Sequence, residues 1–255
     1  MQFIYNFIAR YPRLETILTS IYHAYQGIPR VSHSEITKEL LRECIGKQDP
    51  TILDIGCNDG THTLWFLEIF ENPKIFCFEP DPRAAARFKR QVGQRSNVTL
   101  FENALSGHNG DITFYQSGGQ FDEESAKIMA KGWDRSGSIK PPLEHLKYVP
   151  SVTFDHKITV KTSTLDTWCS EQGIESIDLM WMDVQGAEID VFQGGRNTLT
   201  KTRFIYTEYS NIELYKGQYT LKQLLKCLSS FKPLIRYPYD ILLSNNMLRK
   251  NTSNG

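Results

Sequence analysis

A short apolar strand that runs into a small-residue turn and then a helix constrains the fold of this chain more than any other feature. The strand is predicted at Thr51–Ile55, the turn at 56–60 and the helix at about 63–70. Small residues in such a turn let a ligand lie close to backbone N–H groups at the carboxyl edge of a parallel sheet. The two glycines and Asn58 fall at alternate positions, unlike the G-x-G-x-x-G spacing of dinucleotide sites. The turn therefore predicts an α/β fold with a ligand site at the edge of its sheet.

An acidic residue, Asp54, stands just ahead of this turn, near the end of the strand. A carboxylate at this place repels a pyrophosphate and attracts an ammonium group. The predicted ligand therefore carries an amino-acid group, rather than a diphosphate, at the turn.

The rest of the chain continues to alternate apolar strands with helices. Further strands are predicted at 74–79, 98–105, 111–115, 158–162, 177–184 and 203–209, helices at 81–92, 165–172, 188–198 and 221–228, and a terminal hairpin at 233–243. Such alternation is typical of a mostly parallel sheet that is covered by helices on both faces.

The length of 255 residues suits one large domain with additions. We expect the main domain at 50–255. Apolar and aromatic residues at near-helical spacing predict an N-terminal helical cover at 1–49, which could also join two copies of the chain. An insertion at about 116–151, rich in glycine, proline and charged residues, predicts an acceptor loop or lid.

The charge balance limits the class of partner. The chain has 29 Lys and Arg residues against 29 Asp and Glu residues, so its formal net charge is zero. Proteins that bind nucleic acids normally carry a basic surplus, which releases counterions from the phosphates. We therefore expect a small hydroxylated molecule or a glycan as partner, and no nucleic acid.

The five cysteines are scattered and contain no C-x-x-C pair. This pattern argues against a disulfide framework and a cysteine-rich zinc site, and it favours a reducing, cytoplasmic location. The sequence has no apolar run of 18 residues, so we expect no transmembrane segment, and the N-terminus lacks the pattern of a signal peptide.

Polar residues follow the next two predicted strands. Glu79 lies 19 residues beyond Gly60, close to the offset of about 20 at which a carboxylate binds a ribose diol. Asn103 follows the third strand, where it could meet the edge of an adenine. Acidic or amide side chains at three consecutive strand ends predict a cofactor that contains adenosine.

Six segments of the chain together resemble the FkbM family of S-adenosylmethionine-dependent methyltransferases. They are residues 54–60, 78–82, 103–106, 164–168 and 177–188, and Glu208. The resemblance covers about 51–209. It implies a class I methyltransferase fold, which is Rossmann-like with a seven-stranded, mostly parallel sheet in the order 3-2-1-4-5-7-6. It also implies S-adenosyl-L-methionine as cofactor and O-methylation of a hydroxyl on a carbohydrate or natural product.

The residues and the resemblance together predict the cofactor site. Its predicted members are Asp54, Gly56, Cys57, Asn58, Gly60, Thr61, Glu79, Pro80, Asn103, Ala104 and Asp183. We expect the catalytic residues to be Asp183 and Glu208, because each carboxylate follows or ends an apolar strand at the same sheet edge. They could act as a base or hold a divalent ion, although no metal-ligand spacing indicates one.

Two positions depart from the pattern of the family. Trp181 stands where lysine is common, and Gln185 stands where glutamate is common. If both are lesions, the chain is a scaffold that binds the cofactor without catalysis. An NAD-linked oxidoreductase is a further alternative, which the missing G-x-G-x-x-G and Tyr-x-x-x-Lys patterns disfavour.

Overall fold

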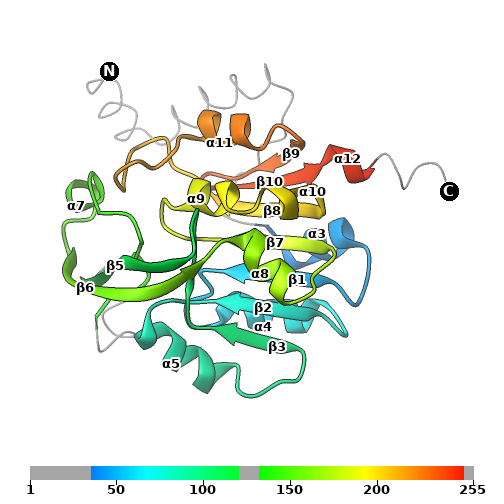
Figure 1. The fold of residues 1–255 in the computed structure, drawn as a ribbon, viewed down its shortest axis with the longest axis horizontal. Coiled ribbons are helices and arrows are strands. Elements are labelled where there is room, and N and C mark those ends of the chain that lie inside the picture. Colours follow the sequence, from blue (N-terminus) through cyan, green and yellow to red (C-terminus); the bar gives the residue numbers. More distant parts are fainter. Residues whose placement is uncertain (1–35, 121–131, 250–255) are drawn as a thin grey trace.

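One seven-stranded sheet forms the centre of the molecule (Figure 1). The computed structural model describes residues 36–120 and 132–249. The strands of the sheet are β1 Thr51–Ile55, β2 Lys74–Phe78, β3 Val98–Phe101, β7 Ile177–Met182, β8 Thr202–Glu208, β9 Phe231–Arg236 and β10 Asp240–Asn245. Their order is β3-β2-β1-β7-β8-β10-β9, which is the order 3-2-1-4-5-7-6 of class I methyltransferases. The predicted fold class is therefore confirmed.

The sheet reverses its winding between β1 and β7. All pairs from β3 to β8 are parallel, whereas β10 is antiparallel to both β8 and β9. From β1 the chain adds β2 and β3 on one side, and it then returns to add β7 and β8 on the other. Ligands of open α/β sheets bind at such a reversal, outside the carboxyl ends of the strands.

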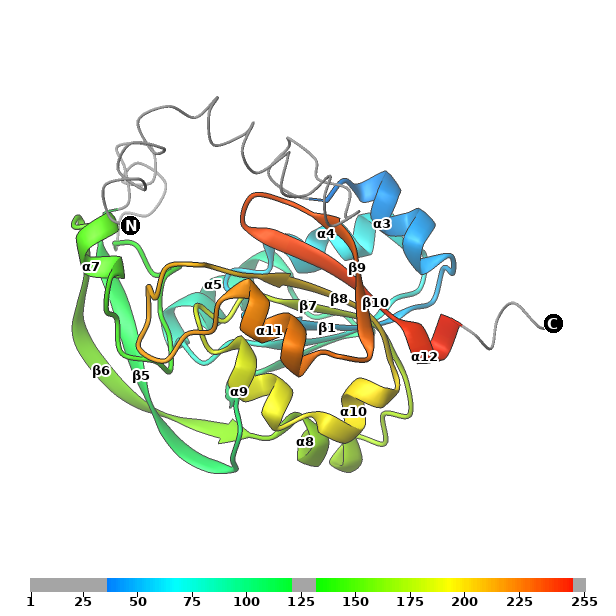
Figure 2. The same ribbon diagram turned by 90° about the horizontal axis from the view of Figure 1, so that it is seen from above.

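Helices cover both faces of the sheet (Figure 2). One face carries α3 Lys38–Ile45, α4 Thr61–Ile69 and α5 Pro82–Gln91; the other carries α8 Leu165–Glu171, α9 Glu188–Gln193, α10 Arg196–Thr200 and α11 Leu221–Cys227. The start of α5 shows how the sequence sets a boundary. The Asp81 side chain caps the backbone N–H of Arg83, and Pro82 occupies the first turn, where no N–H is needed.

A second sheet of three strands stands beside the first. It consists of β4 Ala104–Leu105, β5 Gly110–Gly119 and β6 Val152–Ser163, in the order β4-β6-β5. The single strand predicted at 98–105 is therefore wrong, because the chain leaves one sheet after Phe101 and enters the other at Ala104. Between them the Asn103 amide donates to the Ala104 carbonyl and to Ser163 Oγ.

The helix predicted at 188–198 is also broken, at Gly194 and Gly195. A Cβ on Gly194 would lie 2.2 Å from the Ser106 carbonyl oxygen, and one on Gly195 would lie 2.6 Å from the Leu165 side chain. The two glycines therefore allow close packing against neighbouring segments, and α9 and α10 form in place of one helix.

Two predicted features extend beyond the described residues. The N-terminal helical cover, with its possible role in joining two copies, falls outside them except for α3, and so does the centre of the predicted insertion. The described part of the insertion includes α7 His145–Tyr148, and the chain ends with α12 Asn246–Arg249. Within residues 36–120 and 132–249, no helix has both the length and the apolar character needed to cross a bilayer.

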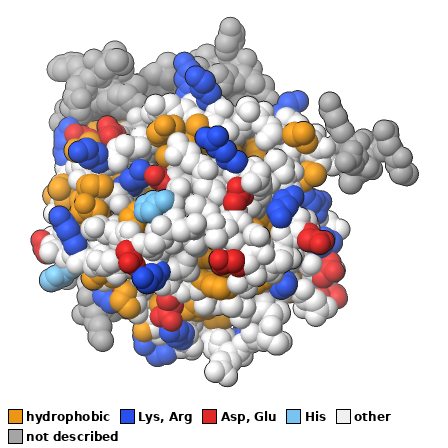
Figure 3. Space-filling view, in the orientation of Figure 1, with side chains coloured by type: hydrophobic (Ala, Val, Ile, Leu, Met, Phe, Trp, Pro, Cys, Tyr) orange, Lys and Arg blue, Asp and Glu red, His pale blue; other side chains and the backbone are white. Residues whose placement is uncertain are grey.

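Charged side chains of both signs are interspersed on the face seen in Figure 3. They do not gather there into one basic patch. This face therefore has none of the electrostatic character of a surface that binds a polyanion.

Candidate active site

A cavity of about 390 Å³ lies at the carboxyl edge of the sheet, where the turns after β1 and β7 meet. We call it the main cavity. Nine of the predicted cofactor residues line it, namely Gly56, Cys57, Asn58, Thr61, Glu79, Pro80, Asn103, Ala104 and Asp183. The structure thus brings together side chains from four strand ends that are up to 127 residues apart in the chain.

The other two predicted cofactor residues, Asp54 and Gly60, support the turn from outside the lining. Asp54 is buried and accepts a hydrogen bond from Thr63 Oγ1 at 2.6 Å, while its Oδ1 is buried without a hydrogen-bond partner. Burial raises the pKa of this carboxyl to about 6. Gly60 has φ +85° and packs against Phe88 and Val92 of the helix region, where a Cβ would lie 2.5 Å from the valine.

The turn after β1 packs tightly against the turn after β7. Gly56 has φ +83°, and a Cβ there would lie 1.8 Å from the Asp183 carbonyl oxygen. The amides of Gly56 and Cys57 both donate to the Phe78 carbonyl, at 2.9 and 3.1 Å. These two N–H groups bond within the protein, so Gly56 serves the close approach of the two turns rather than direct contact with a ligand.

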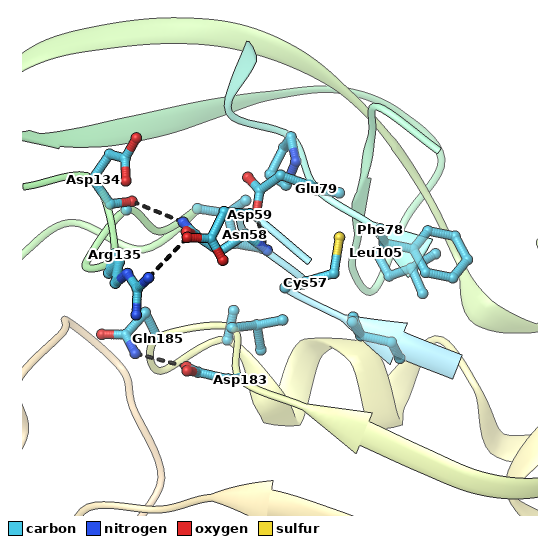
Figure 4. Close-up of a pocket in the computed structure, with 18 of the residues that line it drawn as sticks. Cys57, Asn58, Asp59, Phe78, Glu79, Leu105, Asp134, Arg135, Asp183 and Gln185 are labelled. Atoms are coloured by element: carbon cyan, nitrogen blue, oxygen red, sulfur yellow. Dashed lines mark hydrogen bonds and ion pairs between the residues drawn. The ribbon is translucent and has the colours of Figure 1, made fainter. Parts of the chain in front are cut away.

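Glu79 closes the main cavity at the end of β2 (Figure 4). Its Oε2 accepts from the Asn58 amide at 2.9 Å, and its Oε1 accepts from the Asp81 amide at 2.7 Å. The side chain is buried, which raises its pKa to about 8. A carboxyl group held in this way keeps hydrogen-bonding capacity on its oxygens for the hydroxyl groups of a ligand.

The insertion contributes residues that the sequence reasoning missed. Asp134 and Arg135 line the main cavity, and Arg135 Nη2 donates to Asp59 Oδ2 at 2.8 Å (Figure 4). Asp134 forms a two-pronged ion pair with Arg87 of α5, at 2.5 and 2.7 Å. These contacts join segments that are 47 to 76 residues apart in the chain. No local pattern in the sequence could have indicated them.

Apolar side chains form the opposite wall of the main cavity. Phe78, Leu105, Phe114 and Ile139 come from β2, from both strands β4 and β5 of the second sheet, and from the insertion. A flat aromatic group such as a purine fits between walls of this kind. Asn103, predicted to meet an adenine edge, lies in the same lining.

The two predicted catalytic carboxylates converge on one amide. Gln185 Nε2 donates to Asp183 Oδ1 at 2.7 Å and to Glu208 Oε2 at 3.0 Å. Gln185 has φ +52°, and its Oε1 accepts from the Tyr215 hydroxyl at 3.0 Å. Gln185 is therefore a further residue of the site, and the sequence marked it only as a departure from the family pattern.

Only one of these carboxylates borders the main cavity. Asp183 lines it, whereas Glu208 lines a neighbouring space of about 330 Å³, which we call the side hollow. Burial, and then the negative charge of Asp183, raise the pKa of Glu208 well above its usual range. Glu208 therefore favours its protonated form more strongly than an exposed glutamate does.

The two departures from the family pattern lie close to this pair. Trp181 lines the side hollow and stacks on Tyr206, with ring centroids 4.1 Å apart. Replacing a lysine by Trp181 removes a positive charge, and replacing a glutamate by Gln185 removes a negative one. Relative to the pattern that the resemblance implies, the two departures therefore leave the summed charge of positions 181 and 185 unchanged.

Among residues 36–120 and 132–249, no three potential metal ligands of the His, Cys, Asp or Glu type converge. In this part of the chain, Asp183 and Glu208 therefore have no third side chain of these types placed to hold an ion with them.

Comparisons with known proteins agree with this architecture. Residues 54–236 match the methyltransferase FkbM domain. The chain is 49% identical over 227 residues to the 2-O-methyltransferase NoeI of Sinorhizobium fredii, which covers 88% of this chain and 90% of that protein. It is 23% identical over 175 residues to the hexuronic acid methyltransferase AglP of Haloferax volcanii, with 68% of this chain and 61% of that protein covered.

Solved structures include a methyltransferase from Geobacter sulfurreducens that is 15% identical to this chain. The superposition has a TM-score of 0.43 and covers 90% of this chain and 87% of that one.

Proposed function

Since the chain belongs to the FkbM methyltransferase family, we propose that it transfers a methyl group from S-adenosylmethionine to a hydroxyl oxygen of a carbohydrate. Membership makes the chain a methyltransferase that depends on S-adenosylmethionine. The carbohydrate acceptor is supported by the names of two relatives, one a 2-O-methyltransferase and the other a hexuronic acid methyltransferase.

The main cavity fits this cofactor. Its volume of about 390 Å³ falls within the range of about 300–1,000 Å³ for small-molecule sites. Glu79 is the partner for the ribose diol, and Phe78, Leu105 and Phe114 are the walls for the adenine. Asp54, whose buried Oδ1 has no hydrogen-bond partner, supplies negative charge behind the turn for the amino-acid end.

Asp183 is the residue that accepts the proton. When bound, S-adenosylmethionine supplies a methyl group on a sulfonium, which needs no activation by the protein. An alcohol oxygen is a weak nucleophile until its proton begins to leave, and a positioned base contributes about 10²- to 10⁴-fold. Gln185 holds Asp183 Oδ1 by a 2.7 Å hydrogen bond, so the other carboxylate oxygen can take the proton.

The observation that carries this proposal is the place of Asp183 between two spaces. Asp183 lines both the main cavity and the side hollow, as His62 does, and Asp183 is the one held there by the Gln185 amide. A base that serves methyl transfer must reach the acceptor hydroxyl while standing beside the methyl donor. Glu208, which lines the side hollow alone, acts through a hydrogen bond to the pair rather than as the base.

The insertion is proposed to close the site over its ligands. Asp134 and Arg135 support this role, because they line the main cavity and are tied to α5 and to the turn after β1. We also propose that the enzyme acts in the reducing environment of the cytoplasm. All five of its cysteines are free thiols, and three of them are buried.

A labelled-methyl transfer screen tests the proposed function. The wild-type enzyme is incubated with S-adenosylmethionine carrying a labelled methyl group and with p-nitrophenyl glycosides of hexoses, 6-deoxyhexoses and hexuronic acids, alongside non-sugar alcohols and phenols. We expect a methylated glycoside, detected by mass. Exclusive methylation of a non-sugar hydroxyl would contradict the carbohydrate acceptor.

The same assay tests the base. Asp183→Asn should bind S-adenosylmethionine within about threefold of wild type and lose about 10²- to 10⁴-fold in turnover. A chelator distinguishes two ways of activating the hydroxyl. If Asp183 takes the proton directly, the chelator leaves the wild-type rate unchanged; if an ion held at Asp183 and Glu208 activates the hydroxyl, the chelator lowers that rate.

A further inference from the structure

The side hollow is a second cavity, separate from the one that we assign to the cofactor. It measures about 330 Å³ and shares only two lining residues, His62 and Asp183, with the main cavity. The cofactor is accounted for by the main cavity, yet an acceptor must meet it beside the proposed base. The side hollow is the neighbouring space that satisfies this condition.

Aromatic rings form one part of its lining. Tyr239 lies in the β9–β10 connection with 68% of its surface exposed. Trp181 and Tyr206 lie deeper and stack on one another. An aromatic face presented beside a cavity is suited to the apolar C–H face of a sugar ring, because it combines apolar area with a polar tip.

Carboxyl groups form the other part. Asp183, Glu208 and Asp240 line the side hollow, and Asp240 stands directly opposite Glu208 in the antiparallel register of β8 and β10. Carboxyl oxygens accept hydrogen bonds from hydroxyl groups. No lysine or arginine is among the lining residues. His62 is the only lining side chain that can carry a positive charge, and it is outnumbered by three carboxyl groups, so the lining offers partners for several hydroxyls and is acidic on balance.

We propose that the side hollow binds the acceptor as a neutral pyranose ring, with one C–H face of the ring on Tyr239 and its hydroxyls on the carboxyl groups. This inference rests on the proposed function and specifies the acceptor of the same site. The volume of the side hollow is at the lower end of the range for small-molecule sites, so the hollow suits one sugar residue rather than a long stretch of glycan.

Charge gives the proposal its selectivity. A hexuronic acid would bring a carboxylate into a hollow that already holds Asp183 and Asp240, and like charges at short range repel strongly in a partly buried site. We therefore expect a neutral hexose or 6-deoxyhexose to be preferred over a hexuronic acid by at least about tenfold in kcat/KM.

The test compares three variants with the wild-type enzyme on the p-nitrophenyl glycoside that it methylates best. Tyr239→Ala should raise KM for this glycoside about tenfold or more and leave the Kd for S-adenosylmethionine unchanged. Tyr239→Phe keeps the ring and should stay within about threefold of wild type. Met247→Ala, which truncates a side chain that is 64% exposed on α12, is the matched control and should change neither constant.

A binding experiment makes the result independent of turnover. Ligand-observed NMR with the enzyme loaded with S-adenosylhomocysteine should show contact between the glycoside and wild-type protein, and loss of that contact in Tyr239→Ala. A wild-type KM and NMR signal in Tyr239→Ala would overturn the assignment of the side hollow. An effect of Tyr148→Ala, on α7 of the insertion, in place of Tyr239→Ala would overturn it as well.

Failure of the proposed function looks different. It appears as the absence of any methylated glycoside from wild-type enzyme that still methylates a non-sugar alcohol or phenol. If kcat/KM is higher for a hexuronic acid than for the neutral sugars, the proposal of a carbohydrate acceptor stands and the proposal of a neutral ring in the side hollow is wrong.

Discussion

The two halves of the carboxyl edge treat their acidic residues in opposite ways. At the main cavity, between the ends of β1, β2 and β4, three carboxyl groups have partners inside the protein. Asp59 pairs with Arg135, and Asp134 with Arg87, while Glu79 accepts two backbone N–H groups. The positions of these three side chains are therefore fixed without a ligand.

At the side hollow, beyond the ends of β7 and β8, two carboxyl groups accept hydrogen bonds from an uncharged amide. Asp183 and Glu208 both accept a hydrogen bond from Gln185 Nε2. Since an amide gives hydrogen bonds without neutralising charge, the pair keeps its capacity to share and accept a proton. The contrast supports the proposal that the first half holds the cofactor and the second handles a proton.

The largest expected effect comes from breaking the contact between the two halves. Gly56→Ala places a Cβ 1.8 Å from the Asp183 carbonyl oxygen and forces a non-glycine residue to φ +83°. We expect a loss of about 3 kcal/mol or more in the free energy of unfolding and a Kd for S-adenosylmethionine raised by at least about 100-fold. Chemical denaturation and calorimetric titration measure the two quantities.

Gly93→Ala is the matched control for this change. Gly93 has a similar φ of +69°, but a Cβ there would meet nothing within 4 Å. It should cost about 1 kcal/mol of stability from the backbone conformation alone and leave cofactor affinity unchanged. Equal losses in the two variants would mean that the close approach to Asp183 is not what Gly56 provides.

The sequence predicts the first half better than the second for a physical reason. Strand β1, its turn and Glu79 lie within 30 residues, and periodicity with small-residue spacing reports such local structure directly. The sheet order follows from alternating strands and helices once the family pattern is matched. Asp134 and Arg135 could not be predicted as site residues, because their ion pairs depend on where a loop folds back 47 to 76 residues later.

The same limit explains the errors inside elements. The segment 98–105 has a continuous β pattern in the sequence. Only the tertiary fold shows that the chain passes from one sheet to the other at Asn103, whose amide bonds to Ala104 and Ser163. Gln185 is a similar case. Its two hydrogen bonds to carboxylates require β7 and β8 to be neighbours, which spacing alone does not establish.

An intermediate effect is expected from placing a third carboxyl group directly against Asp183 and Glu208. Gln185→Glu keeps the shape of the side chain but removes the N–H groups that bind Asp183 and Glu208. Because Trp181 supplies no positive charge there, the new carboxyl should raise the pKa of Glu208 further and hold a proton near Asp183. We expect kcat at pH 7 to fall about tenfold and the rising limb of the pH–rate profile to move to higher pH.

Gln116→Glu makes the same change in the first half of the edge. Gln116 donates to Asp81 Oδ1 at 3.0 Å, but Arg83 also pairs with Asp81 and offsets an added charge. Its kcat and pH–rate profile should stay within about threefold of wild type. A profile left unmoved by Gln185→Glu would argue that Asp183 is not the proton acceptor.

The last expected effect is a gradual pH dependence of stability that arises in the first half. Burial raises the pKa of Glu79 to about 8, against an ordinary value near 4.5, so the folded protein binds more protons than the unfolded chain between these values. Stability is therefore highest below about pH 4.5 as far as this group is concerned, and it is lost as the pH rises through 8, by at most about 1.4 kcal/mol per pH unit.

Glu79→Gln removes this titration at the cost of one hydrogen bond from a backbone N–H. Its free energy of unfolding should therefore fall less steeply than that of wild type between pH 5 and 8, so that the difference between the two proteins shrinks as the pH rises. Asp54 and Glu188, with pKa values raised to about 6 and about 7, keep a residual slope of the same sign. Exposed Glu175→Gln is the control and should leave the wild-type slope in place. Parallel curves of the free energy of unfolding against pH for Glu79→Gln and wild type would show that Glu79 is already ionised in the folded protein between pH 5 and 8. The carboxyl group of Glu79 would then be held as a charged group, and its pKa would not be raised.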